Sequence, residues 1–398
     1  MRTIHLLFVL LLLVLGACKK KGSDTPAPQQ PPFVASFSPQ SGETGVEVTL
    51  TGSNFSATAT DNVVQFNGIA ATVKSATTTS IVVSVPQGAT TGKISVQVGS
   101  LSVNSTSNFT VLKWVQKANF GGDGRITSAS FVIGNKAYVG TGAIGNNTTD
   151  YRKDFWEYDP ATNIWTQKAD FGGTTRIGAV GFAIGNKGYM GTGREGGATY
   201  KKDFWEYDPA TNTWTQKADF GGDARAFAVS FNVNNKGYIG TGFDGVRKKD
   251  FWEYDPATNV WTQKADFGGT AKNDAVGFGI GNKGYIGTGS DGSPKKDFWE
   301  YDPATNIWTQ KADFGGDARF GAVSFVLDNK GYVGMGAVSG GTKDFWEYNP
   351  ATNVWTQKAD FGGDIRTQGF GFTVNGKGYV GSGSNGGGFL KDFWVYVP

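Results

Sequence analysis

Six basic residues recur along the C-terminal part of the sequence, each shortly after a Phe-Gly-Gly triplet. An Arg guanidinium presents a planar fork of N–H donors that matches a carboxylate, so a ring of such groups could bind an acidic sugar or peptide. Five of the positions hold Arg, and the fourth holds Lys. The candidates for such contacts are Arg125, Arg176, Arg225, Lys272, Arg319 and Arg366.

An alternative for these cations is pairing within the chain. In four of the six units an Asp lies two residues before the cation, where a local ion pair could consume its charge; these are Asp123, Asp223, Asp317 and Asp364. The second and fourth units have Thr174 and Thr270 at that place. Arg176 and Lys272 are therefore the preferred contacts if a ligand is bound.

The rest of the composition excludes many kinds of site. The sequence holds one histidine, His5, and one cysteine, Cys18. Beyond Cys18, catalysis by a Ser-His or Cys-His pair, zinc held by His or Cys, and disulfides are unavailable. The net charge of +3 over 398 residues predicts no broad basic surface. We expect no metal, no cofactor and no nucleic-acid partner.

The elements that position these cations repeat six times. The Asp of a Lys-Asp-Phe-Trp sequence recurs at intervals of 49, 47, 47, 47 and 48 residues, a period that suits a unit of four short strands. In the second unit the strands are predicted over 177–184, 187–193, 203–207 and 213–217, with a Gly-Asn turn and an Asp-Pro-Ala-Thr-Asn turn between them. No stretch has a helical period.

The two ends of the repeat region complement each other. A fourth-strand Trp, Trp114, precedes the first unit, and the last unit stops after its third strand at 393–398. If the strand of Trp114 pairs with that of Trp394, the two fragments form one four-stranded sheet and the ring of six closes. The sequence therefore predicts a toroid sealed by its own N-terminal strand.

The repeated pattern of an Arg, a small apolar strand, a Tyr followed by glycines, and Tyr-Asp-Pro-x-Thr-Asn-x-Trp resembles the kelch repeat over residues 113–398. Departures are few: Gly191-Thr192-Gly193 replaces the usual double glycine, and Asn349 replaces the turn Asp in the fifth unit. The resemblance implies a six-bladed kelch β-propeller over 112–398, and it implies that the six cations line the channel mouth. The copper site of galactose-oxidase-like propellers needs His and Cys ligands and cannot form here.

Two loops of each unit vary while the rest is nearly constant. One follows the basic residue, and the other follows the second strand, where Arg194 and Phe243 are candidate contacts. In an up-and-down sheet both loops lie at the same end, so one face is diversified as in a scaffold that carries binding loops. The first loop varies at 126–127, 177–178, 226–227, 273–274, 320–321 and 367–368, and the second at 143–144, 194–195, 243–244, 290–291, 337–338 and 384–385.

Residues 1–18 resemble a bacterial lipoprotein signal with its lipobox, because an apolar run leads into Leu15-Gly16-Ala17-Cys18. The resemblance implies lipidation of Cys18 and a membrane anchor; the alternative is an ordinary signal peptide with a stray Cys. The Pro-rich stretch 19–32 is predicted to be an extended tether. Because Lys19 and not Asp follows Cys18, the resemblance implies the outer membrane of a Gram-negative cell envelope.

Residues 33–111 are predicted to form a small all-β domain, with strands at 46–50, 63–66, 80–85, 93–98 and 108–111. The sequences Ser38-Pro39-Gln40-Ser41-Gly42 and 48–55 resemble the immunoglobulin-like IPT/TIG domain. In bacterial surface proteins such a domain usually acts as a spacer or contact module. The predicted fold is thus all-β, with an IPT/TIG β-sandwich before the propeller.

These inferences favour a monomeric, non-catalytic, lipid-anchored envelope protein that binds a glycan or protein through the variable face. The alternative is an enzyme that resembles the six-bladed kelch sialic-acid mutarotases, with Glu195 or Asp244 as general acid and base. A purely structural surface module is a third hypothesis.

Overall fold

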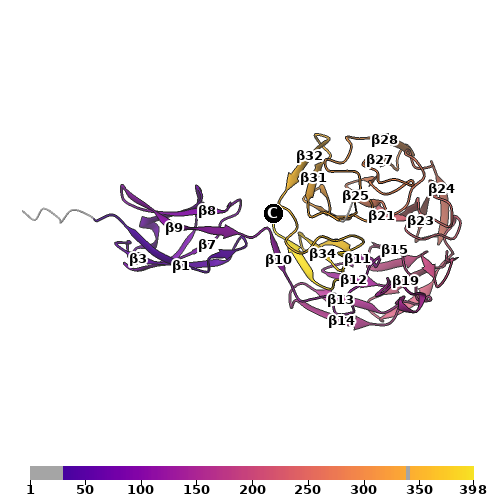
Figure 1. Ribbon diagram of the computed structural model, residues 1–398, viewed down its shortest axis with the longest axis horizontal. Helices are drawn as coiled ribbons and strands as arrows, with labels where there is room; N and C mark the ends of the chain where they lie inside the picture. The colour runs from indigo at the N-terminus through magenta and orange to yellow at the C-terminus, as the bar shows by residue number, and fades with distance from the viewer. Residues whose placement is uncertain (1–29, 338–340) are drawn as a thin grey trace, which may run out of the picture. The chain divides into compact units, whose positions relative to one another are not determined.

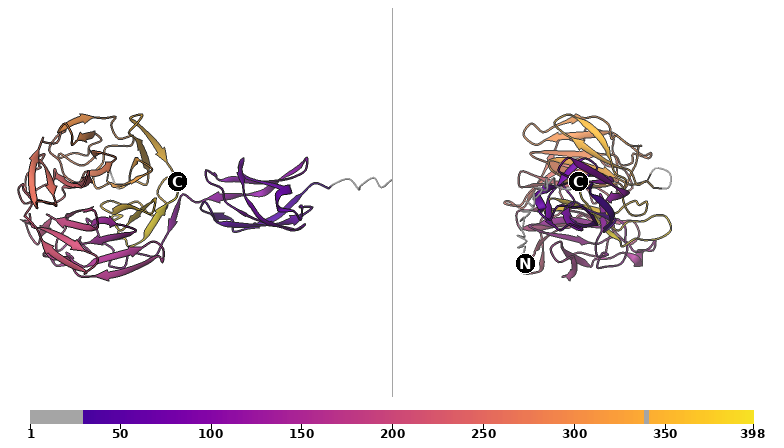
Figure 2. Two further views of the ribbon diagram at one scale, coloured as in Figure 1. Left: turned by 180° about the vertical axis from the view of Figure 1, so that it is seen from behind. Right: turned by 90° about the vertical axis from the view of Figure 1, so that its left-hand side faces the viewer.

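The computed structural model describes residues 30–337 and 341–398, which form two compact β units (Figures 1 and 2). The first unit is a sandwich of two antiparallel sheets, with strand orders β1-β3-β7-β6 and β2-β9-β8-β4-β5. Alternate side chains of these strands are buried between the sheets, among them Val48, Leu50, Ile81 and Phe109. Its strands are β1 (Phe33–Ser38), β2 (Ser41–Gly42), β3 (Glu47–Ser53), β4 (Asn62–Phe66), β5 (Ile69–Ala71), β6 (Val73–Ala76), β7 (Ser80–Ser84), β8 (Gly92–Val98) and β9 (Leu101–Val111), with a 3-10 turn η1 (Ala59–Asp61).

The second unit is a six-bladed β-propeller, and each blade is a four-stranded antiparallel sheet. The first three blades are β11 (Ala129–Ile133), β12 (Lys136–Gly140), β13 (Phe155–Asp159) and β14 (Ile164–Lys168); β15 (Val180–Ile184), β16 (Lys187–Gly191), β19 (Phe204–Asp208) and β20 (Thr213–Gln216); and β21 (Val229–Val233), β22 (Lys236–Gly240), β23 (Phe251–Asp255) and β24 (Val260–Lys264). A short ribbon, β17 (Arg194–Glu195) with β18 (Thr199–Tyr200), rises from the second blade, and a 3-10 turn η2 (Thr148–Asp150) lies in the first.

The other three blades follow the same plan. They are β25 (Val276–Ile280), β26 (Lys283–Gly287), β27 (Phe298–Asp302) and β28 (Ile307–Gln310); β29 (Val323–Leu327), β30 (Lys330–Gly334), β31 (Phe345–Asn349) and β32 (Val354–Lys358); and β33 (Phe370–Val374), β34 (Lys377–Gly381), β35 (Phe393–Tyr396) and β10 (Trp114–Gln116).

The sixth blade is built from both ends of the propeller sequence. Strand β10 pairs antiparallel with β35, with Trp114 opposite Tyr396 and Gln116 opposite Trp394. In Figure 1 the purple β10 lies beside the yellow C-terminal strands. The predicted seal of the ring by an N-terminal strand is therefore confirmed, and the outer edge of β35 is covered.

Aromatic side chains fill the wedges between blades. The Phe155 ring of the first blade lies 4.8 Å from the Tyr207 ring and 5.0 Å from the Trp214 ring of the second. The same contact joins the last blade to the first, because the Phe393 ring lies 4.8 Å from that of Tyr158. Edge-to-face pairs at these distances add to the burial of large apolar surface. The repeated Phe, Tyr and Trp residues are thus accounted for by packing.

Glycine in the second strand of a blade makes room for the Phe of the preceding blade. A Cβ atom built on Gly237 would lie 2.1 Å from ring atoms of Phe182, and one built on Gly188 would lie 2.1 Å from the ring of Phe131. The first blade has Ala137 at this place, and its neighbour is Phe372 of the sixth blade. At the other five junctions blade spacing therefore depends on a glycine, whereas this junction accommodates a methyl group.

Candidate functional site

The two variable loops of every blade meet at one end of the propeller. An isolated bridge joins them in each blade, as between Ile126 and Ala143, between Ala226 and Phe243, and between Asn273 and Ser290. The prediction that both loops share a face is confirmed. We call this end the variable face; the opposite face carries the Asp-Pro-Ala-Thr-Asn turns.

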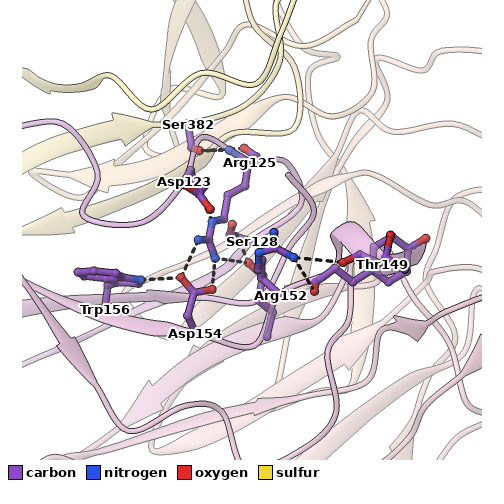
Figure 3. A network of polar contacts seen from close by, with 10 residues as sticks. Asp123, Arg125, Ser128, Thr149, Arg152, Asp154, Trp156 and Ser382 are labelled. Atoms are coloured by element: carbon purple, nitrogen blue, oxygen red, sulfur yellow. Dashed lines mark hydrogen bonds and ion pairs between the residues drawn. The ribbon is translucent and has the colours of Figure 1, made fainter. Parts of the chain in front are cut away.

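The six repeated cations do not lie open at this face, which corrects the prediction that they contact a ligand. Their side chains are at most 1% exposed, and each is paired with the Asp of a Lys-Asp-Phe-Trp sequence. In the first blade, Arg125 Nη1 and Nη2 donate to the Asp154 carboxylate at 2.6 and 2.7 Å (Figure 3). The other pairs are Arg176 with Asp203, Arg225 with Asp250, Lys272 with Asp297, Arg319 with Asp344, and Arg366 with Asp392.

The remaining donors of these cations are also used. Arg125 Nε donates to the backbone oxygen of Asp123 at 3.0 Å, so the nearby Asp contributes its carbonyl and not its carboxylate. Arg176 makes the equivalent bond to the carbonyl of Thr174 at 3.1 Å and is no less compensated than the others. Burial alone would raise the pKa of Asp154, but the hydrogen bonds and charge of Arg125 outweigh it and hold that pKa below its usual range. A buried guanidinium needs such pairing, so the six cations are structural.

Lys272 forms the fewest hydrogen bonds of the six cations. It donates to Asp297 and to the carbonyl of Thr288 at 3.0 Å, and it lacks the second branch with which four of the five arginines reach both carboxylate oxygens. Burial lowers its pKa, although the charge of Asp297 acts in the opposite direction. It is buried like the five arginines and is not available to a ligand.

The nearly constant turns on the opposite face also have structural partners. In the first blade, Asn163 Oδ1 accepts from the Tyr158 hydroxyl at 2.9 Å and from the Ala118 N–H at 3.1 Å, while Trp165 Nε1 donates to the Ala118 carbonyl at 3.3 Å. The turn is thereby bonded to the segment that follows β10 and leads into its own blade. Constancy of these residues between blades follows from packing and indicates no ligand.

A closed ring of six backbone hydrogen bonds surrounds the axis at the variable face. The second variable residue of each first loop has a left-handed backbone and donates its N–H to the carbonyl of its counterpart in the preceding blade. We call these six residues the axial ring. The bonds run from Thr127 to Gln368 (2.9 Å), Gly178 to Thr127 (3.3 Å), Phe227 to Gly178 (2.9 Å), Asp274 to Phe227 (3.1 Å), Gly321 to Asp274 (2.9 Å) and Gln368 to Gly321 (2.7 Å).

The axial ring lines a small cavity. It measures about 150 Å³, and the small residues that follow the ring residues complete its wall. Those residues also border a second cavity of about 250 Å³ along the inner strands, whose wall is formed by Ala, Gly, Ser, Val and one Phe. Because ring backbones are alike, the side chains of the ring alone distinguish one side of the mouth from another. We take this mouth and the surrounding loops as the candidate site.

Asp274 is the ionisable side chain of the axial ring. Its Oδ2 accepts from Asn273 Nδ2 at 2.6 Å, and Asn273 Oδ1 accepts from Arg247 Nε at 3.0 Å. Among the described residues, none forms an ion pair with Asp274 within 4.0 Å. Burial raises the pKa of Asp274 to about 6, although hydrogen bonds from Asn273 and Gln368 act against this. The carboxyl group thus lies near the axis without a direct counter-ion.

Of the predicted loop contacts, Arg194 and Phe243 do lie on the rim around the mouth. Arg194 Nη2 donates to the Tyr151 hydroxyl at 3.1 Å, while its Nε is buried without a hydrogen-bond partner. The Phe243 ring lies 6.2 Å from that of Tyr200, and the guanidinium of Arg247 lies 5.9 Å above it. Both remain candidate contacts.

Sequence reasoning identified the variable loops but did not single out Thr127, Phe227, Asp274 or Gln368. Their positions could have been noticed, since each is the second residue of the variable pair that lies between the repeated cation and the inner strand. The sequence does not show the left-handed backbone turn that places the second residue of each pair, and not the first, at the axis.

The predicted anchor at Cys18, the signal over 1–18 and most of the tether over 19–32 lie outside the described residues. Within the parts that the structure describes, no helix is long and apolar enough to cross a membrane. The same parts hold no group of three or more His, Cys, Asp or Glu side chains placed to bind a metal.

Comparison with known proteins supports the fold of both units. Residues 32–111 match the family model of the IPT/TIG domain, as the immunoglobulin-like resemblance predicted. A search of curated proteins finds no match. A solved structure entitled "Structure of YjhT" is similar with a TM-score of 0.60 and 17% identity, over 70% of this chain and 96% of that chain. At this identity the similarity concerns the fold.

Proposed function

We propose that this protein is a non-catalytic binding module of the bacterial cell envelope, held to the membrane through a lipid on Cys18, which takes a glycan or protein ligand on its variable face. One observation carries the proposal. The residues that repeat between blades are occupied by contacts within and between blades, whereas the side chains that differ gather around one end of the axis.

The charges on the rim favour binding over the alternative of a mutarotase-like enzyme. Glu195 lies 2.5 Å from Lys201 Nζ, and Asp244 lies 2.9 Å from Lys248 Nζ. Burial alone would raise the pKa of Asp244, but the hydrogen bond from Lys248 outweighs this and lowers it, which makes Asp244 a poor proton donor near neutral pH. An NMR assay of sialic-acid anomers tests the alternative: a rate above the uncatalysed one would contradict our proposal.

A matched pair of valines tests the face. Val246 on a rim loop is 69% exposed, and Val260 at the start of β24, next to a nearly constant turn, is 51% exposed. The ectodomain from residue 30 is titrated against defined envelope glycans and purified envelope proteins, with Val246→Glu and Val260→Glu alongside. We expect Val246→Glu to lose at least tenfold in affinity and Val260→Glu to bind normally. Equal affinities of the two variants would overturn the assignment of the face.

The anchor needs its own test. Metabolic labelling with a fatty acid should mark the full chain and leave Cys18→Ser unlabelled, because a thioether-linked lipid requires the sulfur. An unlabelled wild-type chain would contradict the anchor and leave the binding face untouched.

A further inference from the structure

The chemistry of the axial mouth is set by one carboxylate. Among the described residues that line its cavity or the cavity below it, Asp274 alone carries an ionisable side chain, and the neighbours are Ser, Thr, Gln, Phe and small apolar residues. The cations that were expected at this mouth are buried against their own aspartates. A ligand group that enters the mouth therefore meets negative charge, and an acidic group is disfavoured.

The carboxylate of Asp274 has no cation as a direct partner in the described part of the protein and could pair with one supplied by a ligand. Asn273 and Gln368 donate hydrogen bonds to it, and Arg247 contacts Asn273 and not the carboxylate itself. Asp274 is partly buried, and a partly buried carboxylate without a direct counter-ion is unfavourable. A cation that pairs with it offsets part of that cost. The rim carboxylates of Asp244 and Asp291 each pair with a lysine, whereas no ion pair to Asp274 is formed within the described residues.

The rest of the mouth offers groups for a polar ring-shaped ligand. Thr127 lies three steps along the axial ring from Asp274, on the opposite side, and its Oγ1 is buried without a hydrogen-bond partner. Phe227 is the neighbour of Asp274 in the ring and supplies an aromatic surface. The lack of a side chain at Gly178 and Gly321 makes room for the side chains of Phe227 and Gln368, since a Cβ on Gly178 would lie 2.7 Å from the Phe227 ring.

We propose, on the basis of the binding function above, that the axial mouth binds the ammonium group of an amino sugar. Asp274 pairs with the ammonium, Phe227 packs against the sugar ring, and Thr127 and Gln368 bond to hydroxyl groups. A lysine side chain fits less well, because its alkyl stem offers no hydroxyl group to Thr127 and Gln368. A cavity of about 150 Å³ is smaller than the roughly 300 Å³ at which pockets for whole drug-sized ligands begin, so the mouth takes one terminal sugar.

The test uses the ectodomain and four probes at neutral pH: glucosamine, N-acetylglucosamine, glucuronate and butylamine. We expect saturable binding of glucosamine, with the other three at least tenfold weaker. Asp274→Asn keeps the shape of the side chain and should lower the affinity for glucosamine at least tenfold. The control Asp291→Asn changes the same group on the same blade, where Asp291 pairs with Lys295 at 2.8 Å, and should bind glucosamine as the wild type does.

Each other outcome overturns the inference. Equal binding of N-acetylglucosamine or glucuronate would show that the charge of Asp274 does not select the ligand. Butylamine as tight as glucosamine would replace the amino sugar with a simple amine or lysine. No binding of glucosamine while Val246→Glu still abolishes binding of a larger ligand would sink this inference alone, whereas loss of both effects would also remove the proposed function.

Discussion

The backbone N–H of Thr127 in the first blade donates to the carbonyl of Gln368 in the last, at 2.9 Å, and this bond completes the axial ring. The propeller is therefore sealed twice, once at its axis by this bond and once at its outer edge by β10 against β35. Residues from every blade take part in the first seal, while two strands form the second. The consequences for stability can be measured separately.

Trp114→Ala tests the outer seal. Trp114 is 5% exposed, and its ring lies 5.1 Å from that of Phe345 and 4.9 Å from that of Phe361. Loss of this packing should lower the free energy of unfolding by about 3–5 kcal/mol in a urea titration. The control Ile164→Ala removes a side chain that is 56% exposed and should stay within about 0.5 kcal/mol of wild type. Equal, small effects would show that β10 does not hold the ring.

The cation of the fourth blade can be improved. Lys272→Arg restores the fork that reaches both oxygens of Asp297, so the free energy of unfolding should rise by about 1 kcal/mol. The reverse change, Arg225→Lys, should lower it by a similar amount, and Arg225→Met should lower it by about 3–5 kcal/mol because Asp250 is left unpaired. Thermal and urea unfolding of the three variants check the order. A tolerated Arg225→Met would contradict the structural role of the cations.

Asp274→Asn should make the protein more stable above pH 6. The pKa of Asp274 is about 6 in the folded chain and near its ordinary value of 3.8 in the unfolded chain. The folded state thus holds more protons between these values, and the wild type loses stability as pH rises through that window.

The variant lacks this loss, so its advantage in free energy of unfolding should grow from about pH 4 to pH 6 and reach about 1–2 kcal/mol above it, after allowance for partial contact with solvent. Arg247 is the charged group that acts on Asp274, while Asn273 and Gln368 do not titrate in this range. Urea titrations at several pH values check the profile. An advantage that does not change with pH would show that Asp274 is ionised throughout.

Gly237→Ala tests the spacing of blades two and three. The added methyl group would lie 2.1 Å from ring atoms of Phe182, and we expect a loss of about 1–3 kcal/mol in the free energy of unfolding. Addition of Phe182→Leu should recover part of this loss, whereas Phe182→Leu alone should destabilise the protein. Simple additivity of the two changes would argue against the close contact.

Much of the architecture could be predicted from the repeats, because Asp-Phe-Trp marks the third strand of a blade and Asp-Pro-Ala-Thr-Asn marks the turn after it. The predicted strand 187–193 is longer than β16, which ends at Gly191, and β1 and the ribbon β17–β18 were not predicted. Within the described residues the loop after the second strand forms a two-residue ribbon in the second unit, whereas other units have a single bridge there, as between Phe243 and Arg247, so comparison between units could not reveal it. Its residues are also polar and lack the alternation that marks a half-buried strand.

The candidate site was harder to predict for a physical reason. From the sequence, Arg125 was expected to contact either a ligand or Asp123, which lies two residues away. Its partner is Asp154, which lies 29 residues along the chain and is brought close by the folding of the sheet. Chain separation hides such a pair even when both residues recur in every unit. Asp274 is the reverse case, because it occurs in one unit, and its role depends on a left-handed turn that the sequence Asn273-Asp274 does not reveal by itself.

The division of the sixth blade between β10 and β33–β35 bears on how such a chain could change by recombination. Near-identical internal units can be gained or lost in frame without touching either half of that sheet, so copy number is not limited by connectivity. It is limited by the packing of neighbouring blades, because the same aromatic contact recurs between them, as for Phe155 with Tyr207 at 4.8 Å and Phe251 with Tyr301 at 4.8 Å. A chain with five or seven units would still have ends that can pair in one sheet. It could close the ring only if the aromatic packing between all neighbouring blades changed.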